Sequence, residues 1–391
     1  MIGRLFRKSA ILATPSFLLS ALLTAPSAHA LPIASRQIFA GVPLTNSVLL
    51  FDSPAFPDPA NPGSLIAEFQ AYVSLRSVDA SSLVGVLGDA LETLGLDIGD
   101  DIGRAAERLA LFASIGLPAQ SVDVKVGGCG GDEFVEVEDT DLRDLGMMVR
   151  NVSIGSCEGL SAEGGGRLQA SVETSSLDDR VFEATVFASP ADGFGVISDV
   201  DDTIKISNVL DKLELVRKTL LDEPTAVTGM PELYGSLQET LQDPSFFYVS
   251  GSPYQLYPFL RGFVQDNYPT GPLFLKNLTI LDLPSFISSN QADTLNYKVS
   301  QIDRINGMYP AKQFLLIGDS TEQDPEVYGE VFRKYGADFV ACTWIRQVEG
   351  AENSEERFAA AFEGVPPEKV RVFTDAEIGS LASIDIAGGL C

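Results

Sequence analysis

The sequence predicts an α/β protein in two parts, a β-sandwich followed by a doubly wound parallel sheet. Residues 31–190 hold short, partly alternating apolar runs bounded by Gly, Asp and Ser, a pattern typical of strands in a sandwich. Residues 191–391 instead alternate apolar strand-like runs with helical patterns, which favours a parallel sheet covered by helices. The chain has 391 residues, enough for two domains of ordinary size.

Residues 1–30 are expected to be a signal peptide rather than part of the fold. Three basic residues precede an apolar run over 10–23, and small residues surround Ala30, where we expect cleavage. The apolar run is short and contains Pro15, which argues against a transmembrane helix. We therefore expect a secreted or periplasmic protein; an uncleaved anchor is the alternative.

Loss of the signal peptide would change the charge and the chemistry of the mature chain. The formal net charge falls from −27 to −30, and His29, the single histidine, is removed. A chain without histidine cannot use Ser-His-Asp, Cys-His or histidine-phosphate chemistry, or a histidine-rich zinc site. So acidic a chain is also a poor partner for nucleic acid, and we expect at most transient contact with an anionic membrane.

The four cysteines suit an oxidising compartment. Cys129 and Cys157 lie in Gly-rich segments of the first half, and we expect a disulfide between them. Cys342 lies in the apolar run 339–342 and is expected to be a buried thiol, whereas Cys391, the last residue, is expected to be free.

The expected strands of the first part are short and follow one another closely. They cover residues 37–41, 47–51, 67–75, 121–126, 133–138, 147–154, 167–174 and 180–188. Residues 82–115 are the exception, because their apolar residues recur at helical spacing with Asp and Glu between them. We expect a helical insertion that packs its apolar face on the sandwich; a hairpin facing lipid or a partner is the alternative.

The second part alternates strands and helices along the chain. Its expected strands are 195–198, 246–250, 271–275, 313–317, 338–344 and 370–374. Its expected helices are 212–221, 230–241, 253–265, 296–307, 325–335 and 354–362. Strands in this order predict a parallel sheet with helices on both faces.

Polar side chains that suit phosphoryl transfer follow several of these strands. Open parallel sheets bind ligands at the carboxyl ends of their strands. The first strand ends in Asp-x-Asp-x-Thr, the second in Ser-Gly-Ser-Pro, and the fourth in Gly-Asp-Ser with a further Asp five residues on; a lysine lies in the helix before the fourth strand. In chain order, the candidate residues are Asp199, Asp201, Thr203, Ser250, Lys298, Asp319 and Asp324.

Together these segments resemble the haloacid dehalogenase (HAD) superfamily of phosphohydrolases, whose four motifs appear in order. Segments 196–205, 247–257 and 318–328 are similar to the App1-type phosphatidate phosphatases, and the resemblance covers residues 191–378. It implies a capless, Rossmann-like HAD fold with a Mg²⁺ cofactor and a phosphomonoester substrate of the lipid phosphate class. The preceding sandwich is more loosely similar to the β-rich region of bacterial members, and the helical insertion is a departure.

The resemblance also implies a role for each carboxylate. Asp199 would attack phosphorus and form an aspartyl-phosphate, and Asp201 would protonate the leaving alkoxide and then activate water. Asp199, the backbone carbonyl of Asp201 and Asp319 would hold Mg²⁺, an ion that prefers oxygen ligands. Asp324 would complete this metal site by orienting its bound waters, or would orient Lys298.

The remaining roles concern the phosphoryl group and the loop. The resemblance implies that Ser250 and Lys298 hold the transferring phosphoryl oxygens, and that Thr203 fixes its loop through side chain–backbone hydrogen bonds. Structural alternatives exist for single residues: Ser250 and Asp324 could cap helices, and Lys276 or Lys312 could replace Lys298.

The substrate is less constrained than the reaction. The segments over 204–245 and 276–297 are too short for a large cap domain, so the site would be open to a large or membrane-embedded ester. Tyr254, Leu256, Tyr257 and Phe259 could form an apolar lip for a lipid, or could be the inward face of a helix. Alternatives to phosphatidate are another phosphomonoester or, in a different class, a non-catalytic surface-binding module. The sequence does not determine the oligomeric state.

Overall fold

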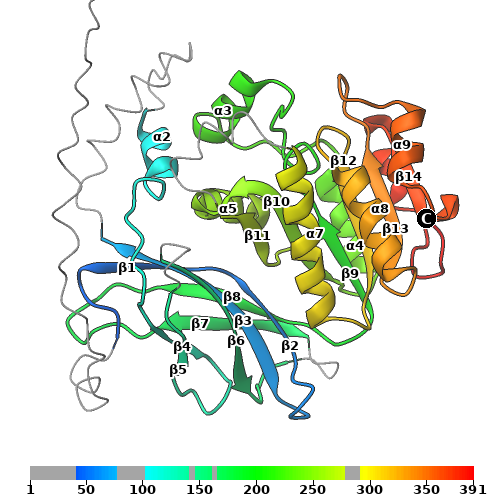
Figure 1. The fold of residues 1–391 in the computed structure, drawn as a ribbon. Helices are drawn as coiled ribbons and strands as arrows, with labels where there is room; N and C mark the ends of the chain where they lie inside the picture. The colour runs from blue at the N-terminus through cyan, green and yellow to red at the C-terminus, as the bar shows by residue number, and fades with distance from the viewer. Residues whose placement is uncertain (1–40, 77–101, 141–145, 161–164, 278–290) are drawn as a thin grey trace, which may run out of the picture. The chain divides into compact units, whose positions relative to one another are not determined.

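A computed structural model describes residues 41–76, 102–140, 146–160, 165–277 and 291–391 (Figure 1). Within it, residues 41–391 form one compact unit. The expected signal peptide, most of the strand over 37–41 and much of the helical pattern over 82–115 lie outside the described residues. None of the helices in the described ranges is both long and apolar enough to cross a membrane.

Eight strands of the first part join into a single sheet. They are β1 (Asn46–Leu50), β2 (Ser53–Pro57), β3 (Leu65–Leu75), β4 (Val122–Val126), β5 (Val135–Val137), β6 (Met147–Gly155), β7 (Gly166–Val172) and β8 (Glu183–Ala188). The sheet runs in the order β1-β3-β2-β8-β7-β4-β5, with β6 paired to β3, and only the β2–β8 pair is parallel. A β-rich first part is observed, whereas the expected arrangement as a two-sheet sandwich is not confirmed.

Strand β2 is absent from the expected set because of its prolines. Pro54 and Pro57 cannot donate hydrogen bonds to a ladder, so the sequence Ser-Pro-Ala-Phe-Pro does not favour a strand. In the structure β2 nevertheless pairs with both β3 and β8.

The described part of the helical insertion packs in a cluster that draws on both parts of the chain. Helix α2 (Ile102–Leu109) buries Ala105, Leu109 and the nearby Phe112 in a cluster formed mainly by the second part of the chain. Arg104 and Arg108 of α2 donate hydrogen bonds to backbone carbonyls at the end of helix α3 (Lys212–Leu220). These carbonyls carry the negative end of the helix dipole, which attracts the two arginines. The same cluster contains Phe51, Tyr72 and Met147 of the first part, so α2 lies against α3 in a cluster that the first sheet shares.

The second part contains a six-stranded sheet in which every pairing is parallel. Its strands are β9 (Phe194–Ser198), β10 (Ser245–Pro253), β11 (Leu273–Lys276), β12 (Gln313–Asp319), β13 (Val340–Arg346) and β14 (Val370–Phe373). The order β11-β10-β9-β12-β13-β14 places β9 and β12 side by side at the centre. The chain order reverses between these two strands, so their carboxyl ends are where such a sheet usually binds ligands.

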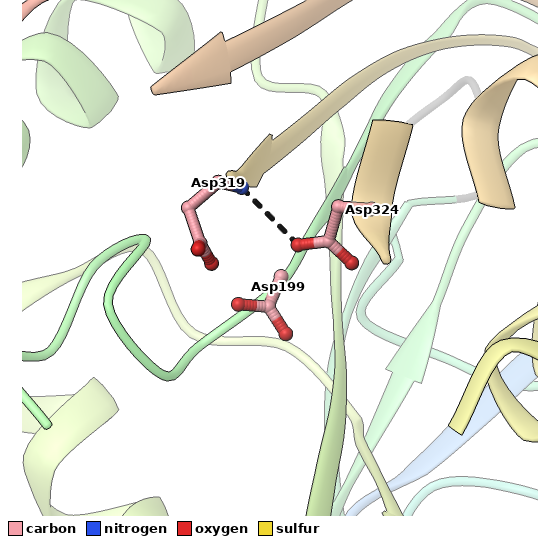
Figure 2. Close-up of side chains that lie close together, drawn as sticks. All are labelled: Asp199, Asp319 and Asp324. Carbon is pink, nitrogen blue, oxygen red and sulfur yellow. Dashed lines mark hydrogen bonds between the residues drawn. The ribbon is translucent and has the colours of Figure 1, made fainter. Parts of the chain in front are cut away.

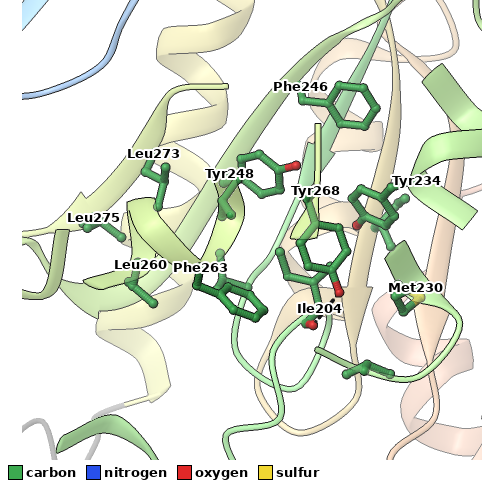
Figure 3. Packing of buried hydrophobic residues seen from close by; sticks show 14 of the residues in the cluster. Ile204, Met230, Tyr234, Phe246, Tyr248, Leu260, Phe263, Tyr268, Leu273 and Leu275 are labelled. Carbon is green, nitrogen blue, oxygen red and sulfur yellow. Dashed lines mark hydrogen bonds between the residues drawn. The ribbon is translucent and has the colours of Figure 1, made fainter. Parts of the chain in front are cut away.

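Helices cover both faces of this sheet. The remaining helical elements are α4 (Met230–Thr240), η3 (Tyr254–Leu256), α5 (Tyr257–Asn267), α7 (Gln291–Met308), α8 (Asp324–Tyr335), α9 (Glu355–Ala361), η5 (Pro367–Lys369), η6 (Asp375–Glu377) and α10 (Ile378–Leu381). Neighbouring residues Val196 and Ile197 of β9 enter two different buried clusters. One cluster contains residues of α4 and α5, part of which Figure 3 shows, and the other contains residues of α7 and α8. The mixed α/β architecture with a parallel sheet is therefore confirmed.

Buried polar contacts join the first sheet to the second part. Asp52, which follows β1, accepts two hydrogen bonds from the guanidinium of Arg261 at 2.7 and 2.9 Å. Its backbone N–H donates to the hydroxyl of Tyr257 at 2.6 Å. Because Arg261 and Tyr257 belong to α5, the first sheet holds the helix that follows the Ser250 strand.

The cysteines form two disulfides. Cys129 pairs with Cys157, as expected. Cys342 pairs with Cys391, so the expectation of a buried thiol and a free terminal thiol is wrong. The bond joins the last residue to β13, a pairing that sequence spacing cannot reveal because it depends on how the C-terminal segment folds back.

Candidate active site

The loop after β9 carries Asp199, the first candidate carboxylate, and is held in shape by Asp202. Asp199 is buried, and its backbone N–H donates to the carbonyl of Ile317 in β12 at 2.9 Å. Asp202 has a φ of +56°, in the left-handed region, and its carboxylate accepts backbone N–H groups from three residues, Ser207, Asn208 and Val209. This clamp fixes the loop around the candidate nucleophile, a role that the sequence analysis did not assign to Asp202.

Lys298 connects three acidic side chains at the carboxyl end of the sheet. Its ammonium lies 2.7 Å from Asp199 Oδ1, 2.5 Å from Asp324 Oδ1 and 3.4 Å from Glu322 Oε2. Lys298 belongs to α7 and is buried, so its charge acts in a poorly solvated site. We call Asp199, Lys298, Asp319, Glu322 and Asp324 the Asp199 cluster.

Asp319 and Asp324 are held by the end of β12 and the start of α8. Asp324 Oδ2 accepts the backbone N–H of Asp319 at 3.1 Å, as Figure 2 shows. Asp319 in turn accepts both the N–H and the hydroxyl of Thr321 on Oδ1. A side chain at Gly318 would come within 2.6 Å of Asp324, which explains glycine at this position. Asp324 thus serves the cluster and not the capping role considered as its alternative.

Thr203 contacts the carboxylate of Asp319. Its hydroxyl donates to Asp319 Oδ2 at 3.0 Å, whereas the expectation was a bond to loop backbone. The hydroxyl therefore links the loop after β9 directly to Asp319 at the end of β12, because these two strands are adjacent.

The residues of the Asp199 cluster fit a hard divalent cation. Asp199, Asp319 and Asp324 each offer a carboxylate oxygen within 4.8 Å of the others (Figure 2). Asp199 Oδ2 is buried without a hydrogen-bond partner among the described residues. A buried carboxylate oxygen without a donor is costly, and a cation would satisfy it. An all-carboxylate donor set is the kind that Mg²⁺ accepts.

Asp201 lies in a different network of donors. Its Oδ1 accepts the hydroxyl of Ser207 at 2.6 Å and lies 3.1 Å from the ammonium of Lys205. Its Oδ2 accepts the hydroxyls of Ser250 at 3.0 Å and Ser252 at 2.8 Å. We call these five residues the Asp201 network. Lys205, Ser207 and Ser252 were not predicted, although Lys205 and Ser252 stand in the motif segments that carry the family resemblance and Ser207 lies two residues after the first of them.

The pKa values of Asp199 and Asp201 are shifted in opposite directions in this structure. Burial raises the pKa of Asp199 well above its usual range, and the Lys298 charge only partly offsets this. Burial would also raise the pKa of Asp201, but Lys205 and the serine hydroxyls outweigh it and hold that pKa at about 2. Burial and the nearby Asp324 charge raise the pKa of Asp319 to about 7. The Asp199 cluster therefore holds excess negative charge, whereas the Asp201 network is compensated.

The two lysines considered as alternatives to Lys298 do not contact Asp199. Lys312 donates to the carbonyl of Asp192, before β9 and at the opposite end of that strand. Lys276 ends β11, and Lys298 alone of the three lysines bonds to Asp199.

The proposed apolar lip is not formed, since Tyr254, Leu256 and Tyr257 are buried in the core. Trp344 is buried in the core, and Arg346 bonds to Asp375 and to the Asp202 carbonyl.

Comparisons with known proteins address the second part of the chain. Residues 194–347 match the family model of the phosphatidate phosphatase APP1 catalytic domain. The chain is 37% identical over 139 residues to phosphatidate phosphatase APP1 of Saccharomyces cerevisiae, covering 35% of this chain and 23% of that protein. It is 27% identical over 172 residues to an uncharacterized protein of Schizosaccharomyces pombe, covering 42% of this chain and 27% of that protein.

These matches confirm the resemblance to the App1 type for residues 194–347. The chain spans about a quarter of the length of these two relatives. Among solved structures, a β-glucuronidase of Bifidobacterium dentium has a TM-score of 0.25 at 9% identity, covering 81% of this chain and 46% of that chain. Such a likeness says nothing about fold or function.

Proposed function

We propose that this chain is an exported, Mg²⁺-dependent phosphatidate phosphatase with a HAD-like catalytic domain. It would hydrolyse phosphatidate to diacylglycerol and phosphate through an aspartyl-phosphate on Asp199. The observation that carries the proposal is the state of the Asp199 carboxylate. One oxygen is bonded to Lys298 and the other has no donor in the described part of the chain, at the carboxyl end of an App1-type sheet.

Asp199, Asp319 and Asp324 would hold the Mg²⁺, with the backbone carbonyl of Asp201 as a further oxygen ligand. When bound, the ion would offset the negative charge of the phosphoryl oxygens and of the carboxylates around them. Lys298 adds a fixed positive charge at the same place, which is where the transferring phosphoryl group would lie.

The chain's own residues would perform two displacements at phosphorus. In the first, a carboxylate oxygen of Asp199 forms a bond to phosphorus, the bond to the lipid oxygen breaks, and Asp201 gives a proton to the leaving alkoxide. In the second, Asp201 takes a proton from water, whose oxygen bonds to phosphorus as the bond to Asp199 breaks. Phosphate leaves, and Asp199 returns as a carboxylate.

The Asp201 network defines how the proton for the first step is supplied. Because the pKa of Asp201 is held at about 2, this residue is ionised in the free protein at neutral pH. A proton must therefore reach Asp201 when the substrate binds, from solvent water or from a protonated phosphoryl oxygen of the substrate. Ser250 and Ser252 both donate to its Oδ2; turning these hydroxyls toward substrate oxygens would raise the pKa of Asp201 and favour this proton uptake.

Two further observations support the lipid substrate and the exported location. Between β9 and β10 the chain forms only the short helices α3 and α4, too little for a cap domain, so a bulky ester can approach. All four cysteines are paired in disulfides, which persist in oxidising compartments.

The test is Mg²⁺-dependent phosphate release from phosphatidate vesicles and from soluble sugar phosphates and phosphopeptides. We expect Asp199→Asn to reduce release by at least about 10³-fold. Asp338→Asn, at an exposed site before β13, is the matched control and should keep wild-type activity.

Equal activity of wild type and Asp199→Asn would contradict the mechanism. Release from soluble esters alone would contradict the lipid substrate. No release from any ester, with an intact fold, would favour the non-catalytic surface module.

A further inference from the structure

A cavity of about 280 Å³ lies between α2 and the start of α5, and it shares no residue with the Asp199 cluster or the Asp201 network. Its walls include Arg108 and Leu111 on and after α2, and Pro258 and Phe259 of α5. We propose that this cavity is a second ligand site, in which Arg108 binds the oxyanion of a phosphonate-, phosphate- or carboxylate-type ligand that carries a short apolar segment.

Arg108 has hydrogen-bonding capacity that the protein does not use. Only 9% of the residue is exposed. Both of its hydrogen bonds come from Nη1, to the backbone carbonyls of Thr219 at 3.0 Å and Asp222 at 2.8 Å. A guanidinium has five N–H donors, two of them on Nη1. The three N–H groups on Nε and Nη2 have no acceptor among the described residues. Those two nitrogens present a parallel pair of N–H groups, the arrangement that receives two oxygens of a carboxylate or phosphoryl group.

The charge of Arg108 is only partly compensated. No carboxylate of the described residues forms an ion pair with it, and burial lowers its pKa to about 10, so that it remains a cation at neutral pH. The carbonyls at the end of α3 offset only part of a buried charge. Glu223 lies at the rim, highly exposed and paired with Arg104 at 2.7 Å, and Glu107 is exposed as well. Glu107, Asp222 and Glu223 thus raise the pKa of Arg108, but none of them forms an ion pair with its guanidinium.

Apolar surface adjoins the guanidinium. The ring of Phe259 lies 3.9 Å from the Arg108 guanidinium carbon and holds its plane in place. Leu111 and Pro258 add further apolar wall. A volume near the lower limit of ligand pockets, about 300 Å³, suits a head group with a few carbons, not a two-chain lipid. These features favour an oxyanion attached to an alkyl segment.

The test uses non-hydrolysable ligands and a reporter in the cavity wall. Leucine methyl groups of the full chain are labelled for NMR, and the Leu111 signal is identified by its loss in Leu111→Met. Titration with methylphosphonate and dodecylphosphonate is expected to shift this signal to saturation. Arg108→Gln should raise the dissociation constant at least tenfold.

The two ligands distinguish the possible sources of the oxyanion. Tighter binding of dodecylphosphonate supports the proposed ligand, an oxyanion attached to an apolar segment. Equal binding of the two ligands would overturn the apolar part of the proposal and indicate a site for a free oxyanion. The absence of a saturable shift with both ligands, or equal binding by wild type and Arg108→Gln, would overturn the proposal.

A second variant keeps the test valid if the loss of Arg108 weakens the end of α3. Pro258→Glu places a carboxylate at the exposed wall of the cavity and leaves every Arg108 bond intact, with Pro258→Gln as its neutral control. We expect at least tenfold weaker binding for the Glu variant and less than threefold for the Gln variant. Equal binding by the two would overturn the proposal. Because no turnover is measured, the outcome is independent of the proposed phosphatase activity.

Discussion

The Asp199 cluster and the Asp201 network begin two residues apart in the sequence and differ in almost every electrostatic property. Around Asp199, one ammonium serves three carboxylates, and an oxygen of Asp199 lacks a donor among the described residues. Around Asp201, each carboxylate oxygen has two polar partners. The first group requires an additional positive ligand, whereas the second is already complete. The difference supports the proposal that Asp199, and not Asp201, receives the metal and the phosphoryl group.

The largest expected effect on stability comes from removing the shared cation. Lys298→Met should lower the free energy of unfolding by about 3–5 kcal/mol at pH 7.5 without Mg²⁺, because it leaves buried carboxylates unpaired. Urea denaturation measures the change. Lys334→Met, which removes an exposed lysine paired with Asp303, is the control and should cost less than about 1 kcal/mol. Equal losses in the two variants would show that the buried carboxylates of the Asp199 cluster do not depend on the Lys298 charge.

The second prediction concerns the pH dependence of the metal-free protein. The pKa of Asp319 is raised to about 7, so the folded state binds a proton more tightly than the unfolded state. The resulting stabilisation is complete below the unfolded pKa and is lost as the pH rises through about 7. Compared with wild type, Asp319→Asn should therefore lose less stability between pH 5 and pH 8, by on the order of 2 kcal/mol.

Unfolding free energies of both proteins at the two pH values give this difference. Added Mg²⁺ should reduce it, because the ion stabilises the ionised carboxylate of the wild type. An identical pH dependence in wild type and variant would contradict the raised pKa.

Removing the other buried lysine should have a smaller effect. Lys205→Met should cost about 1.5–2 kcal/mol at pH 7.5, since three serine hydroxyls still donate to Asp201. The measurement is the same urea titration. A loss as large as that of Lys298→Met would mean that the Asp201 network is not complete without its lysine, and the comparison would fail.

The smallest effect is expected from single hydroxyls of the Asp201 network. Ser252→Ala removes one of two donors to Asp201 Oδ2 and should cost about 1 kcal/mol. Ser250→Ala should cost more, because the Ser250 hydroxyl also accepts the backbone N–H of Ser252 at 2.9 Å. Thermal denaturation of the two variants compares them directly. The opposite order would show that Ser252 is the principal support of Asp201.

Much of the site could be predicted from the sequence. Asp199, Lys298, Asp319 and Asp324 were identified from their motifs, and the structure brings them together. Motifs at strand ends are informative because the ends of parallel strands share one edge of a sheet. Lys205 and Ser252 were missed, although they stand beside predicted residues. Nothing in spacing shows whether a neighbouring side chain turns toward the site or away from it.

The sequence by itself determined the order of strands and helices in residues 191–391, the candidate site residues and the App1-type resemblance. These depend on local periodicity and on short motifs, which are legible without contacts. The tertiary structure decided that Asp201 is compensated while Asp199 is not, that α2 lies against α3, and that Cys342 pairs with Cys391. Each of these depends on distances between residues far apart in the chain, and only packing fixes such distances.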